Sequence, residues 1–284
     1  FNYVVGEMAR GITTPRMVVE AVRAGCIGFY GSAGLPLEEI ERGIREIKAG
    51  LSEHQISWGA NLIHTPQQPG YEASVVDLFL REGVRRVSAS AYMRLSPDIV
   101  RYTALGLERD AQGKIRRSNH VFAKVSRAEV AEQFLAPAPE KILKDLVSSG
   151  AISKAQAELA ALVPVAAEIT AEADSGGHTD RRSAAPLFSS ICAARDRVAA
   201  KTGIDPDAVR IGLAGGIATP HAVAAAFGMG AAYVLTGSIN QAAVESGLSL
   251  PGRQMLAKAG PADVAMAPAA DMFEQGIEVQ VLKR

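Results

Sequence analysis

A histidine, His178, follows two glycines in the stretch EADSGGHTD (residues 172–180), which also contains three carboxylates. An imidazole is the side chain best suited to donating or accepting a proton near neutral pH. Gly176 and Gly177 allow a sharp backbone turn with exposed N–H donors directly before it. We therefore interpret His178 as a catalytic proton donor, with a structural histidine that caps the loop as the alternative.

The other histidines are weaker candidates for proton transfer. His64 lies closest to the predicted site, after the stretch GANLI. His54, His120 and His221 lie in predicted turns or at a predicted helix start, where we expect them to be solvated.

Two glycine motifs follow the last two predicted strands, in LAGGIATPHAV (213–223) and VLTGSINQA (234–242). Gly215 and Gly216 let backbone N–H groups approach an anion, and the helix that begins at Thr219 adds partial positive charge. Gly237 and Ser238 repeat this pattern. The loops after strands seven and eight are the usual phosphate site of a (β/α)8 barrel, so the pair predicts a phosphate site. Tight turns without a ligand are the alternative.

Small and polar residues at other strand ends would suit a flat heterocyclic ring. Met8 and Ala9 offer an unobstructed floor, and Asn61 can both donate to and accept from a ring edge. Lys124 is a cation at the end of strand five and needs an anionic partner. A reduced flavin is one such partner, and a salt bridge to Glu172 or another wall carboxylate is the alternative.

Short apolar runs alternate with amphipathic stretches along the chain. The predicted strands are 2–9, 26–31, 57–63, 85–91, 121–126, 168–173, 210–216 and 232–238. The predicted helices between them include 14–25, 36–51, 71–83, 186–203 and 219–230. Eight such units predict an α/β fold, a TIM (β/α)8 barrel.

Two stretches interrupt the alternation. Residues 107–120 predict a polar hairpin that turns at Gln112–Gly113. Residues 136–166 predict a pair of helices broken at Gly150, inserted between strands 5 and 6. We expect this insertion to form a lid over the carboxyl ends of the strands, and a surface excursion without a role is the alternative.

Composition narrows the class of protein. The 284 residues are 48% hydrophobic, and Lys+Arg and Asp+Glu are equal at 30 each, which argues against a nucleic-acid binder. No apolar run approaches a membrane span, no signal peptide is visible, and the two cysteines suit a reduced, cytoplasmic protein. No metal-binding motif is present. We expect one domain, 1–284, trimmed at both ends from a longer protein.

These stretches, together with GEMARGITTPRMVVEAVRAGCIGFYGSAGL, ANLIHTP, VRRVSASAYM and MAPAADMFEQGIEVQVLKR, closely resemble the PfaD-type enoyl reductases. Those flavoproteins serve synthases of polyunsaturated fatty acids and trans-acyltransferase polyketide synthases. Their wider relatives are nitronate monooxygenases and FMN-dependent enoyl reductases. Asp180 and the insertion at 136–166 favour the synthase-linked branch over the nitronate branch.

The resemblance implies FMN as the cofactor, with NADPH as electron donor, and an enoyl thioester on an acyl carrier protein as substrate. It assigns the FMN phosphate and ring to the following residues: Met8, Ala9, Asn61, Lys124, Glu172, Gly176, Gly177, Gly215, Gly216, Gly237 and Ser238. His178 matches the catalytic histidine of the relatives. Nitronate oxidation by O2 and a non-catalytic docking subunit remain the alternatives, and a homodimer is left open.

A set of basic residues could bind an acidic carrier protein. The set comprises Arg81, Arg85, Arg86, Arg94, Arg101, Lys114, Arg116 and Arg117. Solvated helix and hairpin faces are the alternative interpretation.

Overall fold

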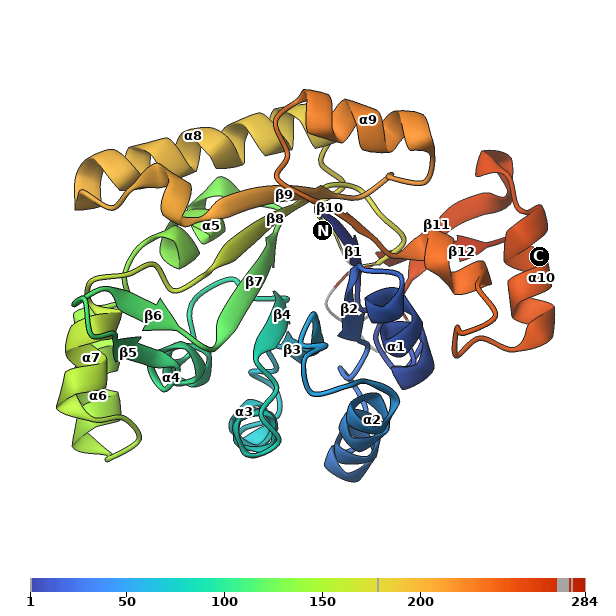
Figure 1. Cartoon of the computed structure of the whole chain (residues 1–284). Coiled ribbons are helices and arrows are strands. Elements are labelled where there is room, and N and C mark those ends of the chain that lie inside the picture. Colours follow the sequence, from blue (N-terminus) through green and yellow to red (C-terminus); the bar gives the residue numbers. More distant parts are fainter. Residues whose placement is uncertain (1, 178, 270–275, 277, 284) are drawn as a thin grey trace.

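Eight parallel strands close into a barrel, which confirms the predicted TIM-barrel fold (Figure 1). The structure is a computed structural model that describes residues 2–177, 179–269, 276 and 278–283. The barrel strands are β1 (Tyr3–Val5), β2 (Ile27–Tyr30), β3 (Trp58–Ile63), β4 (Arg86–Ser90), β7 (His120–Val125), β8 (Glu168–Glu172), β9 (Arg210–Ala214) and β10 (Val234–Thr236). Their order is β1-β10-β9-β8-β7-β4-β3-β2, and the pairing of Tyr3 with Val234 closes the ring.

Helices follow most of the barrel strands and cover their outer face, and others belong to the insertion and to a C-terminal segment (Figure 1). They are α1 (Pro15–Arg23), α2 (Leu37–Gly50), α3 (Tyr71–Arg81), α4 (Pro97–Ala104), α5 (Ala128–Leu135), α6 (Glu140–Ser148), α7 (Lys154–Ala160), α8 (Ala184–Thr202), α9 (Pro220–Gly228) and α10 (Leu250–Lys258), with short 3-10 helices at η1 (Pro206–Ala208), η2 (Ser238–Ala242) and η3 (Pro261–Asp263). Within the described ranges, none of them is long and apolar enough to cross a membrane.

Three of these helices begin at a hydroxyl residue followed by proline. The side chains of Thr14, Ser96 and Thr219 each accept a hydrogen bond from the backbone amide three residues later. Such N-caps satisfy amides that the first turn leaves unpaired. The predicted helices do not include α4 or α5, although Ser96–Pro97 carries the same start signal as the other two.

The inside of the barrel is filled by an apolar plug, formed by Val4, Phe29, Phe122, Ala214, Tyr233 and Leu235. The ring of Phe122 meets those of Phe29 and Tyr233 edge-on, at centroid distances of 5.2 and 5.8 Å. Side chains one layer nearer the carboxyl ends of the strands therefore lie above a closed floor. A second, larger core fills the space between strands and helices.

The insertion forms the predicted helical pair, α6 and α7, but it lies at the other end of the barrel from the expected lid. Helix α5 has already returned the chain to the amino ends of the strands, and there Ala167 N donates to the carbonyl of Val121, near the start of β7. The pair packs against α4 and against the predicted polar hairpin, β5 (Leu107–Arg109) and β6 (Ile115–Arg117) (Figure 1). Because an insertion that follows the helix of a βα unit emerges at the amino-terminal face, it does not cover the carboxyl ends.

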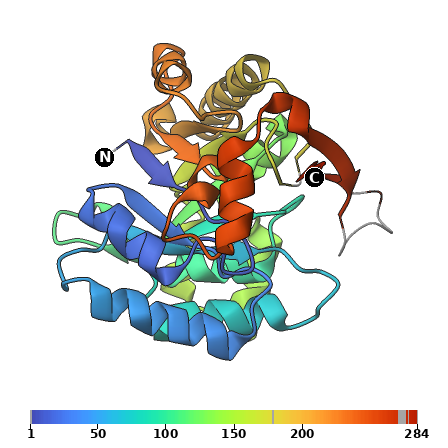
Figure 2. The same ribbon diagram turned by 90° about the vertical axis from the view of Figure 1, so that its right-hand side faces the viewer.

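A C-terminal segment beyond the barrel, not predicted as secondary structure, contains α10 and an antiparallel pair, β11 (Val264–Pro268) and β12 (Glu278–Leu282). It lies beside the end of β10 and near α1 (Figures 1 and 2). Thr14 Oγ1 donates to the carbonyl of Glu245 at 2.6 Å. Gln280 N donates to the carbonyl of Gly176 at 3.2 Å, so β12 reaches the loop after β8.

Candidate active site

Three ionisable side chains meet above the apolar plug. Lys124 Nζ lies 2.8 Å from Glu7 Oε1 and 3.0 Å from Glu172 Oε1. Lys124 is in β7, Glu172 ends the neighbouring β8, and Glu7 follows β1. Since β1 and β7 are four places apart in a ring of eight strands, the ion pair of Glu7 with Lys124 crosses the barrel. We call these three residues the ion triad.

Lys124 stays charged in the folded protein. Burial by itself lowers the pKa of its ammonium, but the adjacent carboxylates of Glu172 and Glu7 outweigh that effect and hold the pKa above its ordinary value. The alternative interpretation of Lys124, a salt bridge to Glu172 or another wall carboxylate, therefore describes its contacts in this structure. The sequence analysis missed Glu7, although a carboxylate directly after the first strand is itself a signal.

Glu7 is the least satisfied member of the ion triad. Its side chain is 2% exposed. Oε1 is held by charge rather than by a well-aligned hydrogen bond, and Oε2 accepts no hydrogen bond from the residues that the structure describes. A buried carboxylate oxygen without a partner is costly, so native proteins usually keep one where a ligand or water completes it.

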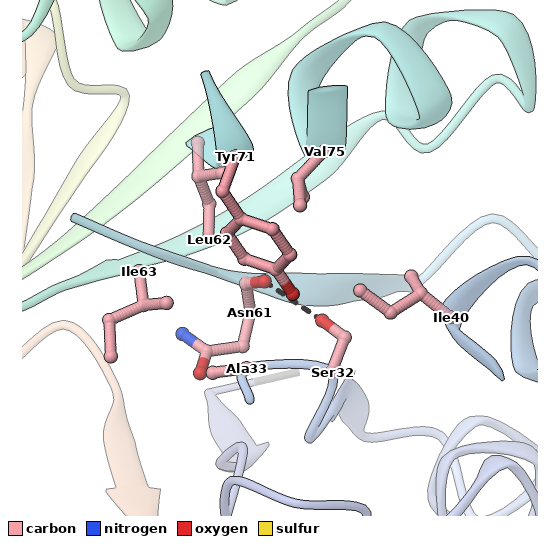
Figure 3. A pocket seen from close by; sticks show the side chains of 8 residues that line it. All are labelled: Ser32, Ala33, Ile40, Asn61, Leu62, Ile63, Tyr71 and Val75. Atoms are coloured by element: carbon pink, nitrogen blue, oxygen red, sulfur yellow. Dashed lines mark hydrogen bonds between the residues drawn. The ribbon is translucent and has the colours of Figure 1, made fainter. Parts of the chain in front are cut away.

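Asn61 is held rigidly beside the strand ends. Its Nδ2 donates to the carbonyl of Ser88 at 3.0 Å and to Ser90 Oγ at 2.9 Å, which leaves the amide oxygen to meet a ligand. Its own carbonyl accepts from Ser32 Oγ at 2.8 Å (Figure 3). Figure 3 shows a narrow hollow around this residue, lined by Ser32, Ala33, Ile40, Asn61, Leu62, Ile63, Tyr71 and Val75. Residues of α2 and α3 contribute to this lining, so the hollow lies between the strands and the helices. The hollow is therefore separate from the ion triad.

Two glycines after β9 adopt backbone conformations that other residues avoid. Gly215 has a φ of 93° and Gly216 a φ of 68°. A Cβ at Gly215 would lie 2.5 Å from the carbonyl oxygen of Ala173, in the neighbouring loop after β8. The turn therefore requires glycine and brings the two loops into contact.

The loops after β8 and β10 also meet. A Cβ at Gly176 would lie 2.9 Å from Ser238 Oγ, so the two loops approach closely. Ser238 is exposed at the start of η2, directly after Gly237. Gly177 is exposed too, with open space around it. The loop after β8 thus contacts both Gly215, after β9, and Ser238, after β10.

Met8 and Ala9 lie on a tightly tied loop between the ion triad and this glycine cluster. Met8 N donates to Thr13 Oγ1 at 2.8 Å, and Thr13 Oγ1 donates in turn to the carbonyl of Gly6 at 3.0 Å. A Cβ on Gly237 would lie 3.9 Å from Met8 Cγ. Met8 is half-buried and Ala9 is exposed, which suits a platform for a flat ring.

His178 lies outside the described residues, so its catalytic role stays a prediction. The loop that carries it is anchored on both sides. Asp180 forms a two-pronged ion pair with Arg127, at 2.6 and 2.9 Å, and this hydrogen-bonded contact lowers the pKa of the Asp180 carboxyl. Arg181 pairs with Glu278 in β12. Asp180 therefore serves as a tether.

His64 belongs to a buried polar network that the sequence did not reveal. Its Nδ1 lies 2.8 Å from Glu72 Oε2, and its ring stacks on Tyr92 at 5.0 Å. Glu72 Oε1 accepts from Tyr92 at 2.7 Å and from Ser96. Burial, followed by the charge of Glu72, raises the pKa of Tyr92 well above its ordinary value. Both carboxylate oxygens of Glu72 thus have partners, three in all. The network lies between the ends of β3 and β4.

The proposed basic patch does not form one free surface. Arg117 is half-buried, donates to the backbone carbonyls of Pro164 and Val165, and has its pKa lowered to about 10 by burial. Arg116 pairs with Asp110 at 2.6 Å and Arg101 with Asp77 at 2.6 Å. These arginines stabilise the hairpin, the insertion and the helices rather than facing the carboxyl ends of the strands.

The donors and acceptors fit the expected FMN. Its phosphate requires backbone amides and a hydroxyl on neighbouring loops, and Gly176, Gly237 and the exposed Ser238 are residues of this kind on neighbouring loops. Its ring requires a platform and an edge with both donors and acceptors, and Met8 and the ion triad provide them. The unpartnered oxygen of Glu7 is an acceptor that a ligand at this edge would complete.

Comparisons with known proteins agree with the fold. No family model matches the chain. It is 45% identical over 280 residues to one component of the polyunsaturated fatty acid synthase of a Thraustochytrium species, covering 98% of this chain and 19% of that protein. It is 44% identical over 284 residues to the polyketide biosynthesis protein PksE of Bacillus subtilis, covering 100% of this chain and 37% of that protein.

Among solved structures, the enoyl reductase domain of MlnA, from the macrolactin biosynthesis cluster of Bacillus amyloliquefaciens, matches with a TM-score of 0.94 and 38% identity. The match covers 100% of this chain and 64% of that one. FabK of Thermotoga maritima, with a TM-score of 0.66 and 19% identity, shares the fold.

The strand order defines a (β/α)8 barrel, the fold shared with the enoyl reductase domain of MlnA. Within it, the chain belongs to the PfaD-type enoyl reductase family. The chain spans between about a fifth and two fifths of the length of these two curated relatives.

Proposed function

We propose that this barrel binds FMN and uses NADPH to reduce the α,β-double bond of enoyl thioesters carried by an acyl carrier protein. The observation that carries the proposal is the likeness to the enoyl reductase domain of MlnA over the whole chain. The relatives named for polyketide and polyunsaturated fatty acid synthesis support substrates of the thioester class.

The residues that would hold FMN divide into two groups. Backbone amides of Gly215, Gly216 and Gly237, with the hydroxyl of Ser238, would bind the phosphate. Met8 and Ala9 would support the ring, and Asn61, Lys124 and Glu172 would lie along its polar edge. When bound, FMN would supply a hydride carrier between the nicotinamide and the substrate.

The chain's own residues would supply position, charge and a proton. The ammonium of Lys124, kept charged by its two carboxylates, would stabilise negative charge at the ring edge. His178 would donate a proton to the α-carbon of the thioester. The pair of Arg127 and Asp180 would fix the loop that presents His178, and the apolar plug would exclude water from below.

A visible absorption spectrum of the purified protein, followed by bleaching with NADPH under nitrogen, tests the proposal. Flavin bands that bleach with NADPH and recover on adding an enoyl thioester are expected. His178→Ala should keep the bleaching and slow the recovery by roughly 10² to 10⁴. Loss of both steps, or of neither, would count against the role of His178.

The same preparation of the protein distinguishes the two alternative functions. Turnover of an alkyl nitronate with O2 and without NADPH would identify a nitronate monooxygenase. A colourless protein that FMN does not reconstitute would identify a docking subunit.

A further inference from the structure

The carboxylate of Glu7 lacks a full set of hydrogen-bond partners among the residues that the structure describes. Lys124 carries one positive charge and contacts two carboxylates, Glu7 and Glu172. Glu172 is partly exposed at the end of β8, and its side chain can be solvated. Glu7 has a side chain that is only 2% exposed, yet its Oε2 has no partner among the described residues. Within the site, Glu7 is therefore the acceptor that lacks a donor.

The surroundings of Glu7 limit where that donor can come from. The apolar plug below it contains Phe29 and Phe122, which offer no side-chain N–H or O–H group. The hydroxyl of Tyr233, also in the plug, is engaged with Thr170 Oγ1 at 2.7 Å. Lys124 lies two residues beyond Phe122 in β7, so it shares the inward face of that strand and lies one layer nearer the carboxyl end. A donor for Glu7 is therefore expected from the side on which the cofactor would bind.

The side-chain amide of Asn61 does not supply the donor. Both protons of Asn61 Nδ2 are used by Ser88 and Ser90. Above the apolar plug, the ammonium of Lys124 is a donor that lies directly beside an acceptor, the carboxylate of Glu7. The pyrimidine edge of an isoalloxazine is complementary to that pair, because its imide N3–H stands next to carbonyl oxygens.

We propose that Glu7 recognises the cofactor by accepting the N3–H of the flavin ring, while Lys124 donates to the neighbouring carbonyl oxygen. This inference rests on the proposed function, since it requires a flavin at this site. It makes Glu7 a determinant of specificity for rings that carry an imide N–H.

Titration of the apoprotein with FMN and with 3-methyl-FMN, followed by the change in flavin fluorescence, tests the assignment. Methylation at N3 removes the donor and leaves the phosphate and the rest of the ring intact. Wild-type protein should bind FMN at least roughly tenfold more tightly than 3-methyl-FMN, as expected for a hydrogen bond to a charged acceptor. In Glu7→Ala this ratio should fall to about two or less, the remainder being steric.

Two further variants keep the test decisive. Glu172→Gln removes the other carboxylate that contacts Lys124 and makes the same change of charge, so it should weaken both ligands while keeping the wild-type ratio. Glu7→Gln keeps an acceptor of similar shape without charge, and its ratio should lie between those of wild type and Glu7→Ala. If Glu7→Ala does not fold, as judged by circular dichroism, the ratio for Glu7→Gln decides.

The outcomes separate this inference from the proposed function. A wild-type ratio near one, or equal ratios in wild type and the Glu7 variants, would overturn the role of Glu7 while leaving FMN binding established. Failure of the wild-type apoprotein to bind either flavin would overturn both.

Discussion

Glu7 and Lys124 stand on opposite walls of the barrel, and their side chains meet above its apolar centre at 2.8 Å. The contact links the first strand to a strand more than a hundred residues later in the chain. It puts a charged pair where a (β/α)8 barrel otherwise packs aliphatic layers. Such a pair is weak evidence for stability and better evidence for a site, because well-packed apolar residues would often serve stability as well.

Removal of Lys124 is expected to destabilise the apoprotein strongly. Lys124→Met leaves the carboxylates of Glu7 and Glu172 without their cation, and loss of one partner from a buried ion pair costs about 3–5 kcal/mol. Urea unfolding measures the change, and Lys144→Met, at an exposed helical pair with Glu140, should cost less than about 1 kcal/mol. Adding Glu7→Gln to Lys124→Met should recover part of the loss. Equal effects of the two lysine substitutions would contradict the buried pair.

Acid should weaken the fold through His120, which the sequence analysis expected to be solvated. Burial, with the nearby charges of Arg86 and Arg117, lowers the pKa of His120 from 6.5 to about 4. Between these values the unfolded chain binds a proton that the folded chain does not, so stability is complete above about pH 6.5 and is lost as the pH falls toward 4.

Urea midpoints at pH 7, 5.5 and 4.5 measure this effect. The decline should be shallower in His120→Gln than in wild type. His54→Gln, at an exposed histidine, should leave the decline unchanged. Parallel curves for wild type and His120→Gln would show that the imidazole is not responsible.

Gly215 should tolerate no side chain. Gly215→Ala puts a Cβ at a φ of 93° and 2.5 Å from the carbonyl oxygen of Ala173, so we expect a loss of at least about 2 kcal/mol. Gly228→Ala, in α9 with open space around it, is the matched control and should be neutral or slightly stabilising. Thermal unfolding of both variants makes the comparison, and a neutral Gly215→Ala would contradict the close approach of the two loops.

The tether at Asp180 should affect one half of the proposed reaction. Asp180→Ala frees the loop from Arg127, so recovery of the reduced protein by an enoyl thioester should slow by roughly tenfold, less than for removal of the proton donor itself. Bleaching by NADPH should be unchanged. Arg127→Ala should have the same effect, and the double variant should be no slower, as a double-mutant cycle in stopped-flow would reveal. Additive losses would show that the two residues act separately.

The barrel could be predicted because its signals are local. All eight strands are short apolar runs, and the starts at Thr14 and Thr219 carry capping chemistry that can be read residue by residue. The predicted position of the lid is wrong for a different reason. Its helices follow from the sequence pattern, but α5, which the pattern did not reveal, determines which end of the barrel the insertion reaches.

The positions of Lys124, Glu172 and the tandem glycines at the strand ends could be predicted from the sequence, and their role in binding a cofactor stays a prediction. Glu7 was missed because its role depends on Lys124, which lies across the barrel. No spacing in the sequence indicates that these two residues are in contact. The network of His64 and Glu72 was missed for the same reason, since its three partners come from separate loops.

The pairing of β1 with β10 has a consequence for how the molecule is made. Tyr3 finds its neighbour Val234 only after more than two hundred residues have left the ribosome, and the contact of Thr14 with Glu245 comes later still. Such distant contacts slow folding and leave open strand edges exposed in the meantime. During synthesis the nascent chain must therefore persist as an incomplete sheet. The loops at Met8 and Ser238 can reach their final arrangement only after β10 has paired with β1.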